Sequence, residues 1–297
     1  MKRLLSCYAS DLQNLSKDEL KQAISTSEGR TILGETVVTA APLLEGVSNP
    51  EVMASFGADL IVLNEFDVFT TFINGFHPCE NPIAEVKRLT GRPVGINLEP
   101  VDSTAQVLDE KVILSKGRQV SKESLQAAQN LGVDFLMLTG NPSTGVSLAA
   151  IKEAIALSKT YFKGLIFAGK MHGAGLSEDI FSLQTLTDFI KVGADGVLIP
   201  SPSTVPFATE EAAYQASKAV KELGGLVITT IGTSQESADE MTIRTIGLSN
   251  KRIGADIHHI GDGGYGRMPI PENILALGLA IRGRRHTYFK MSQSPLR

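Results

Sequence analysis

The sequence has 297 residues, of which 42% are hydrophobic and 20% charged, a composition typical of a soluble globular protein with a large core. The net charge of −4 argues against a nucleic-acid surface, and no apolar run approaches the length of a membrane span. With only two cysteines, a disulfide framework is not expected, and a reducing cytoplasm is the predicted location.

The N-terminal stretch, residues 1–34, predicts a helical extension. Ser16 and Glu19 have the spacing of a capping box and precede the segment LKQAI. Such a box marks the first turn of a helix. We expect this extra helix to lie under the floor of the domain that follows.

Eight short apolar runs, rich in Val, Ile and Leu, follow along the chain. Four of them open with a Gly-Ala-Asp or Gly-Val-Asp triplet, at Gly57, Gly132, Gly193 and Gly254. The other four cover residues 36–42, 93–100, 164–170 and 225–232. Continuous apolar runs too short for helices are typical of parallel strands that are covered on both faces. The sequence therefore predicts eight buried parallel strands.

Segments with apolar spacing near 3.6 residues separate these runs, notably 145–160, 181–192 and 208–223. Alternation of strand and helix over eight units predicts an α/β fold, a (β/α)₈ TIM barrel, over residues 35–290, with a tail at 291–297. A doubly wound open sheet is the alternative. It would carry a G-x-G-x-x-G motif after the first strand, and that motif is absent there.

The active site of a barrel lies just past the carboxyl ends of its strands, and those positions are polar in this sequence. The catalytic candidates are Glu65, Glu99, Lys170, His172 and His258. The substrate-binding candidates are Asn64, Asn97, Thr139 and Asn141. The same residue types also cap helices and bond backbone, which is the alternative role for Asn141 in particular. Because strand side chains alternate, one of His258 and His259 should face the barrel interior.

Lys170 lies between glycines at the end of the fifth predicted strand. A lysine there could form a Schiff base, act as a base, or hold a negatively charged group. We expect the last of these, an electrostatic clamp, because Glu65 and Glu99 come from neighbouring strands and would favour the charged amine. An exposed lysine at a loop start is the alternative.

Glu65 and Glu99 end the second and third predicted strands. Two carboxylates there could hold Mg²⁺ or work as an acid–base pair, so no cofactor is certain and Mg²⁺ is the one considered. A zinc site is not expected, because His77 and Cys79 lack further ligands of the right type.

Two loops, IGTSQES after the seventh strand and GDGGYG after the eighth, predict a phosphate site. Backbone N–H groups of such loops bind anions in many barrels. The predicted phosphate-binding residues are Gly232, Thr233, Ser234, Gly261, Gly263 and Gly264. A tight turn is the alternative reading of the glycines, and Asp262 would repel a phosphate unless it points away.

The triplets and glycine loops make the chain resemble phosphate-binding (β/α)₈ barrels, a class that includes sugar-phosphate epimerases, isomerases and aldolases. Glu65 and Glu99 are also similar to the strand-end carboxylates through which the phosphoenolpyruvate mutase and isocitrate lyase class binds Mg²⁺. The signature cysteine loop of the lyases in that class is absent, and Cys79 does not stand in its context.

The first resemblance implies an enzyme that acts on a small phosphorylated metabolite, a sugar phosphate or keto-acid phosphate. The reaction would be proton transfer next to a carbonyl, of the isomerase, epimerase or aldolase type. A Mg²⁺-dependent lyase or mutase is the second interpretation, and a non-catalytic metabolite-binding barrel is the third. The sequence predicts neither a nucleic-acid nor a membrane partner, and leaves open a homo-oligomer.

Overall fold

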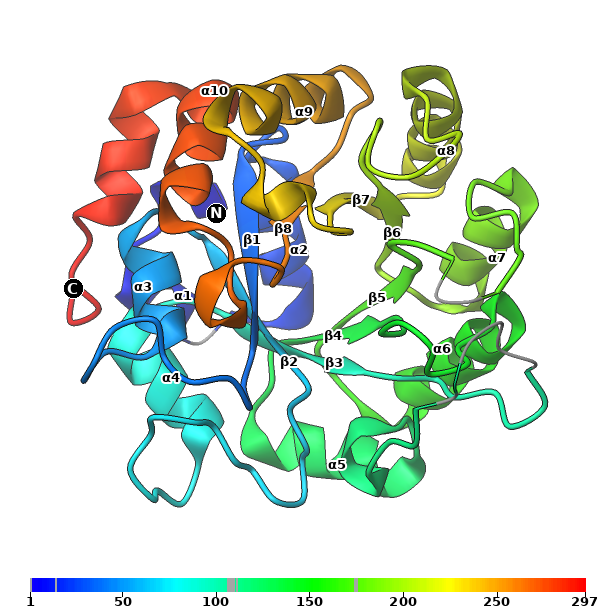
Figure 1. Cartoon of the computed structure of the whole chain (residues 1–297), viewed down its shortest axis with the longest axis horizontal. Helices are drawn as coiled ribbons and strands as arrows, with labels where there is room; N and C mark the ends of the chain where they lie inside the picture. The colour runs from blue at the N-terminus through cyan, green and yellow to red at the C-terminus, as the bar shows by residue number, and fades with distance from the viewer. Residues whose placement is uncertain (1, 14, 106–109, 111, 174–175) are drawn as a thin grey trace.

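The chain folds into a closed barrel of eight parallel strands, paired in sequence order from β1 to β8 and back to β1 (Figure 1). The computed structural model describes all residues except 1, 14, 106–109, 111 and 174–175. The strands are β1 (Thr31–Val37), β2 (Leu60–Asn64), β3 (Val94–Leu98), β4 (Phe135–Leu138), β5 (Leu165–Gly169), β6 (Gly196–Pro200), β7 (Leu226–Ile231) and β8 (Ile257–Ile260). The predicted (β/α)₈ barrel is confirmed.

The sequence predicts strand starts near residues 36, 59, 93, 134, 164, 195, 225 and 256, and seven of the eight strands begin within one residue of these positions. The exception is β1. It was expected from residue 36 and begins at Thr31, in the segment TILGETV. Gly34 and Glu35 weaken the sequence signal for a strand in this segment, because glycine and glutamate are poor strand formers. Glu35 is nevertheless buried, paired with His259 of the adjacent β8. The shift matters for function, because it places Glu35 inside the barrel.

Helices surround the barrel and bury their apolar faces against the outer side of the strands (Figure 1). They are α3 (Asn49–Ser55), α4 (Pro82–Thr90), α5 (Lys122–Leu131), α6 (Leu148–Tyr161), α7 (Leu183–Val192), α8 (Glu210–Glu222), α9 (Glu240–Arg252) and α10 (Pro271–Met291). Side chains cap several of their N-termini, including Ser121, Ser147 and Asp239. Among the described helices, none combines the length and apolar character needed to cross a membrane.

The N-terminal extension closes the bottom of the barrel, as predicted. It consists of η1 (Leu4–Ser6), α1 (Ala9–Leu12) and α2 (Lys17–Ser25). Ser16 and Glu19 form the predicted capping box at the start of α2. Leu4, Leu20 and Ile24 join the inward side chains of the strands in one buried cluster. The interior is therefore filled from below, which leaves the opposite end as the place for a cavity.

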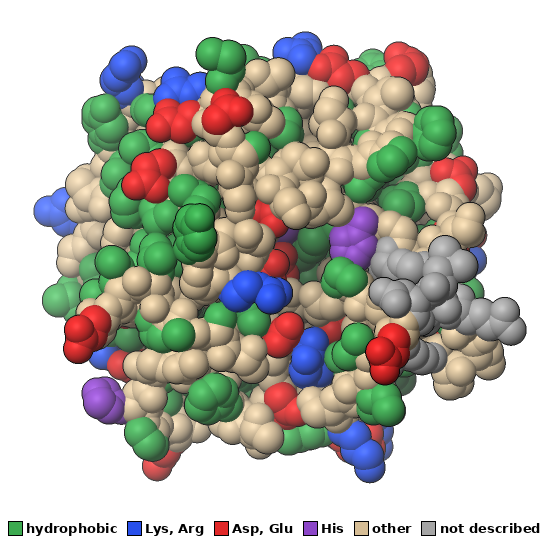
Figure 2. All heavy atoms as spheres, in the orientation of Figure 1, with side chains coloured by type: hydrophobic (Ala, Val, Ile, Leu, Met, Phe, Trp, Pro, Cys, Tyr) green, Lys and Arg blue, Asp and Glu red, His purple; other side chains and the backbone are tan. Residues whose placement is uncertain are grey.

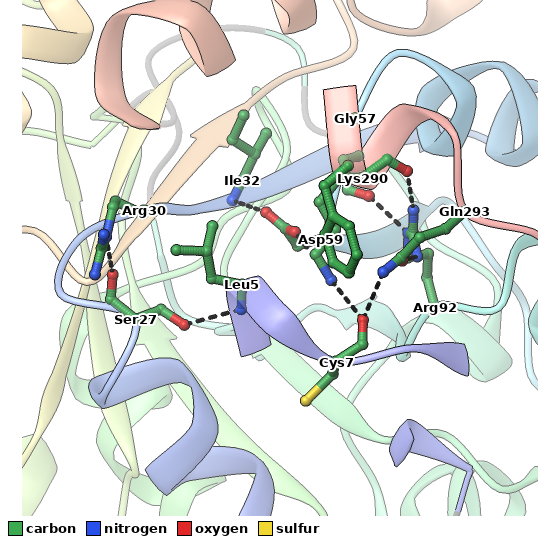
Figure 3. A network of polar contacts seen from close by, with 12 residues as sticks. Leu5, Cys7, Ser27, Arg30, Ile32, Gly57, Asp59, Arg92, Lys290 and Gln293 are labelled. Carbon is green, nitrogen blue, oxygen red and sulfur yellow. Dashed lines mark hydrogen bonds and ion pairs between the residues drawn. The ribbon is translucent and has the colours of Figure 1, made fainter. Parts of the chain in front are cut away.

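A buried ionic network ties α10 to the same end of the barrel (Figure 3). The Oδ2 atom of Asp59 accepts from Arg282 Nη1 at 2.5 Å and from the backbone N of Ile32 at 2.8 Å. Lys290 Nζ lies 3.7 Å from the other oxygen, and Arg92 Nη2 donates to the Lys290 carbonyl at 2.7 Å. These contacts hold the chain terminus against the barrel bottom.

Candidate active site

A cavity of about 290 Å³ opens at the carboxyl ends of the strands. Its described lining is Glu35, Asn64, Asn97, Thr139, Gly140, Asn141, Pro142, Met171, His172, Gly232, Thr233, Ser234, Glu236, Gly261, Asp262 and Arg267. Figure 2 shows acidic side chains gathered in a hollow near the centre of this face, with a histidine beside them. The four predicted substrate-binding residues all line this cavity.

Three asparagines from neighbouring strands form the amide side of the cavity. Asn64 and Asn141 exchange hydrogen bonds through their side-chain amides, at 2.9 and 3.0 Å. Asn97 Nδ2 donates to Asn64 Oδ1 at 3.2 Å. Asn64 Nδ2 also donates to Asp262 Oδ2 at 2.8 Å. The amide cluster therefore fixes the position of Asp262, the carboxyl group across the cavity mouth.

Glu99 and Glu65 do not form the Mg²⁺ site that the sequence left open as one of two alternatives, because Arg118 contacts both carboxylates. Arg118 Nη2 donates to Glu99 Oε1 at 3.2 Å, and its Nη1 lies 3.8 Å from Glu65 Oε2. Glu65 also accepts from Thr39 Oγ1 at 3.0 Å. In the described part of the chain, no three His, Cys, Asp or Glu side chains are grouped to hold a metal ion. The guanidinium supplies the positive charge that these carboxylates need.

Glu99 instead holds Asn141 in place. Its carboxylate accepts from the backbone N of Asn141 at 2.8 Å and from Asn141 Nδ2 at 2.7 Å. The side chain is 1% exposed and does not line the cavity. The role predicted for Glu99 in chemistry is therefore replaced by a positioning role, with Arg118 as its counter-ion.

The two histidines of β8 face opposite sides, and the choice of His258 as the inward one is wrong. His259 Nε2 lies 2.6 Å from Glu35 Oε2, inside the barrel. His258 points toward the outer helices, where its Nε2 bonds the Gly29 carbonyl at 2.9 Å. Complete burial lowers the pKa of His258 to about 4, so it is a neutral structural residue. Side chains alternate along a strand, so the sequence predicts that one of two adjacent histidines faces inward. It does not say which of the two.

Asp262 is the titratable group of the cavity whose pKa is moved to near neutrality. Burial, followed by the neighbouring charge of Glu35, raises the pKa of Asp262 to about 6, and the Asn64 hydrogen bond limits this rise. Burial also raises the pKa of Glu236, which is 3% exposed. A half-buried carboxyl group in a cleft, with a pKa raised toward neutrality like that of Asp262, is a candidate acid–base residue.

Lys170 does not reach the cavity, and the predicted clamp with Glu65 and Glu99 is wrong. The amine is 1% exposed and donates to Glu178 Oε2 at 2.5 Å and to the Gly173 carbonyl at 3.2 Å. Glu178 in turn accepts from the backbone N of Leu148, at the start of α6. Lys170 thus anchors the loop after β5. That loop carries His172 to the cavity, and burial followed by the charge of Lys170 lowers the pKa of His172.

The two predicted phosphate loops both line the cavity, and the carboxyl group of Glu236 lies against Gly263 of the second loop. Glu236 lies so close to Gly263 that a Cβ there would stand 1.7 Å from Glu236 Oε1. Gly264 faces the Met268 carbonyl, which a Cβ would approach to 2.2 Å. These two glycines serve close packing within the protein. Gly232, Thr233, Ser234 and Gly261 line the cavity, and their binding of a phosphate stays a prediction.

From residue 5 to residue 297 the sequence matches the model of a family described as Domain of unknown function (DUF7916). The chain belongs to this family. No curated protein matches it by sequence. Among solved structures it is similar to a provisionally named lyase/mutase from Burkholderia cenocepacia J2315, with a TM-score of 0.51, 15% identity and 83% of each chain covered.

A second similar structure is 2,3-dimethylmalate lyase, a member of the PEP mutase/isocitrate lyase superfamily. The TM-score is 0.51 at 13% identity, and the match covers 83% of this DUF7916 chain and 81% of the lyase. The predicted resemblance to TIM-barrel enzymes is confirmed. At these identities the likeness establishes the fold, and the chemistry has to be argued from the cavity.

Sequence reasoning missed three charged groups of the DUF7916 cavity. Glu35 was hidden by the misplaced start of β1, and Glu236 lies in a short 3-10 turn, η3 (Gln235–Ser237). Arg267 follows the GDGGYG segment in η4 (Tyr265–Arg267), where Asn49 Nδ2 bonds the carbonyl of Gly266 at 2.9 Å. The glycine-rich segment was the available signal for Arg267, because it marked the loop that presents it.

Proposed function

We propose that this protein is a lyase or mutase that moves a proton at a carbon next to a carbonyl group, with Asp262 as the acid–base residue. The observation that carries this proposal is the half-buried carboxyl of Asp262, which lines the cavity, has a pKa of about 6 and is bonded to Asn64. At neutral pH such a group is ionised enough to accept a proton and weakly acidic enough to return it.

Abstraction of that proton leaves an enolate, whose negative charge needs donors and a cation nearby. Arg267 is a described residue of the cavity lining with a permanent positive charge, and Thr139 adds a hydroxyl on the strand side. Preorganised donors of this kind stabilise charge as it develops in the transition state. We propose that Arg267 binds the carboxylate of the substrate and stabilises the enolate. Asp262 accepts the proton and returns it.

The proposal includes neither the Mg²⁺ ion considered in the sequence analysis nor the phosphate group predicted for the substrate. The carboxylates predicted to hold Mg²⁺ are bridged by Arg118, so no step is assigned to a metal. No phosphate group is assigned to the substrate, because the Glu236 carboxyl lies against Gly263 of the loop predicted to bind it. Of the reaction predicted from the sequence, the proposal keeps the proton transfer next to a carbonyl group.

Proton exchange in D₂O tests the proposal without knowledge of the full reaction. The protein is incubated with a panel of small 2-keto acids, and loss of the signal of the carbon-bound proton next to the carbonyl is followed by NMR. We expect exchange with at least one acid, slowed roughly 10²–10⁴-fold in Asp262→Asn, the range typical of general acid–base catalysis. Asp188→Asn, the same change at a partly exposed position of α7 that does not line the cavity, serves as the control.

Exchange by Asp262→Asn at the wild-type rate would refute the role of Asp262. Absence of exchange with every acid of the panel would count against the proton transfer. Binding without exchange would instead support the non-catalytic metabolite-binding barrel that the sequence left open.

A further inference from the structure

The walls of the cavity carry buried polar atoms that have no hydrogen-bond partner within the described part of the chain. They are Asn97 Oδ1, Thr139 Oγ1 and Glu236 Oε2, on residues that are only 2–4% exposed. A buried polar atom left unpaired is costly, and such atoms in native proteins call for an explanation. All three residues line the same cavity, and a rotation that turns each covered atom toward it would let a bound ligand satisfy them.

The chemistry of the three atoms restricts that ligand. Asn97 Oδ1 only accepts, and the amide nitrogen of the same side chain is already bonded to Asn64. Glu236 Oε2 accepts when ionised and donates when protonated, and burial raises the pKa of this group. The Thr139 hydroxyl does both. A hydroxyl group, which donates and accepts at once, matches all three atoms.

Other ligand groups match them less well. A phosphate or a second carboxylate brings acceptors only, and would face Asn97 Oδ1 and the carboxyl groups of Glu236 and Glu35. An alkyl chain would leave every one of these atoms unpaired. An ammonium group satisfies acceptors, but it would share the cavity with the guanidinium of Arg267. The mixed set of donors and acceptors therefore favours hydroxyl groups.

We propose that the ligand of this cavity is a polyhydroxylated carboxylic acid, an aldonic acid or its keto derivative. Its carboxylate would lie on Arg267, and its hydroxyls would bond Asn97, Thr139 and Glu236. The cavity of about 290 Å³ corresponds to roughly ten water volumes, which suits a chain of about four to six carbons. The keto form of the substrate rests on the proposed function, whereas the binding of hydroxyl groups does not.

Calorimetric titration tests the ligand class. The probes are aldonic acids of four to six carbons in several configurations, with hexanoate, 6-aminohexanoate and inorganic phosphate as comparisons. We expect at least one aldonic acid to bind roughly 30-fold more tightly than hexanoate, the effect of about two added hydrogen bonds. The same preference should appear in Asp262→Asn, which separates binding from proton transfer.

Two threonine variants form a matched pair. Thr139→Val removes an unpaired hydroxyl that lines the cavity, and Thr287→Val removes an unpaired, fully buried hydroxyl in α10. Neither change breaks a hydrogen bond of the described structure, so both proteins should fold. Thr139→Val should bind the aldonic acid about 10-fold more weakly, and Thr287→Val should bind it like the wild type.

Equal affinity for hexanoate, tighter binding of 6-aminohexanoate or phosphate, or unchanged binding by Thr139→Val would each overturn the proposal. So would failure of every aldonic acid to bind at about 10 mM, beyond the millimolar end of specific affinity. Hydroxyl-dependent binding without proton exchange would refute the proposed function alone. Exchange of simple keto acids without any preference for hydroxyl groups would refute the ligand class alone.

Discussion

Replacement of Arg118 by methionine tests the finding that a guanidinium, and not a metal ion, joins Glu65 and Glu99. The Arg118 side chain is 19% exposed and that of Glu99 is 1% exposed, so Arg118→Met leaves a buried carboxylate without its counter-ion. Loss of one partner of a buried ion pair costs about 3–5 kcal/mol. Glu99 keeps two hydrogen bonds from Asn141, so we expect the lower end of that range, about 3 kcal/mol.

Urea unfolding followed by circular dichroism measures this loss. Glu99→Gln and the double variant complete a cycle, in which the double variant should be more stable than additivity predicts by at least about 1 kcal/mol, because no unpaired charge remains. Millimolar Mg²⁺ should not raise the melting temperature of the wild type. Wild-type stability of Arg118→Met, or Mg²⁺ stabilisation that Glu99→Gln abolishes, would refute the assignment.

Three further experiments test other assignments. Burial lowers the pKa of Lys290 to about 8 from 10.5, so the folded protein binds fewer protons than the unfolded chain between these values and gains stability as pH rises. Between about pH 7.5 and 9.5 this gain is about 2 kcal/mol, and Lys290→Met should lack it in urea unfolding; an identical pH dependence would contradict the burial. His258→Leu should lower the free energy of unfolding by about 1–3 kcal/mol through loss of the bond to Gly29. The affinity for the aldonic acid, measured by calorimetry, should not change. Weakened binding would show that the His258 side chain faces the cavity. Borohydride treatment with 2-keto acids should leave Lys170 unmodified by mass spectrometry, because its amine is held by Glu178, and a reduced adduct on Lys170 would show that it reaches the substrate.

The alternation of apolar runs and amphipathic segments predicted the barrel, because burial on both faces forces each strand to be continuously apolar. The same reasoning failed at β1, where a buried hydrogen bond between Glu35 and His259 replaces an apolar contact. Local patterns carry no information about such a pair, since its members are 224 residues apart.

The rule that a barrel cavity lies at the carboxyl ends of the strands predicted four of the residues that line it, because their positions follow from the barrel alone. They are Asn64, Asn97, Thr139 and Asn141. Roles that depend on loop conformation could not be predicted. Arg118 reaches Glu99 only through the path of the long loop after β3, as the bond from the Glu99 backbone N to the Arg118 carbonyl at 2.8 Å shows. Lys170 was misassigned for the same reason, since its partner Glu178 belongs to the loop after β5.

The pKa of Asp262 is the quantity on which the proposed acid–base chemistry depends most directly. Carbon-13 NMR of aspartate side-chain carboxyl groups, recorded from about pH 3 to 8, measures it without a substrate. We expect one aspartate to titrate near pH 6, to vanish in Asp262→Asn, and to move to lower pH in Glu35→Gln, because the Glu35 charge contributes to the raised value. Titration of Asp262 below pH 4, as for an ordinary exposed aspartate, would contradict its role as the acid–base residue.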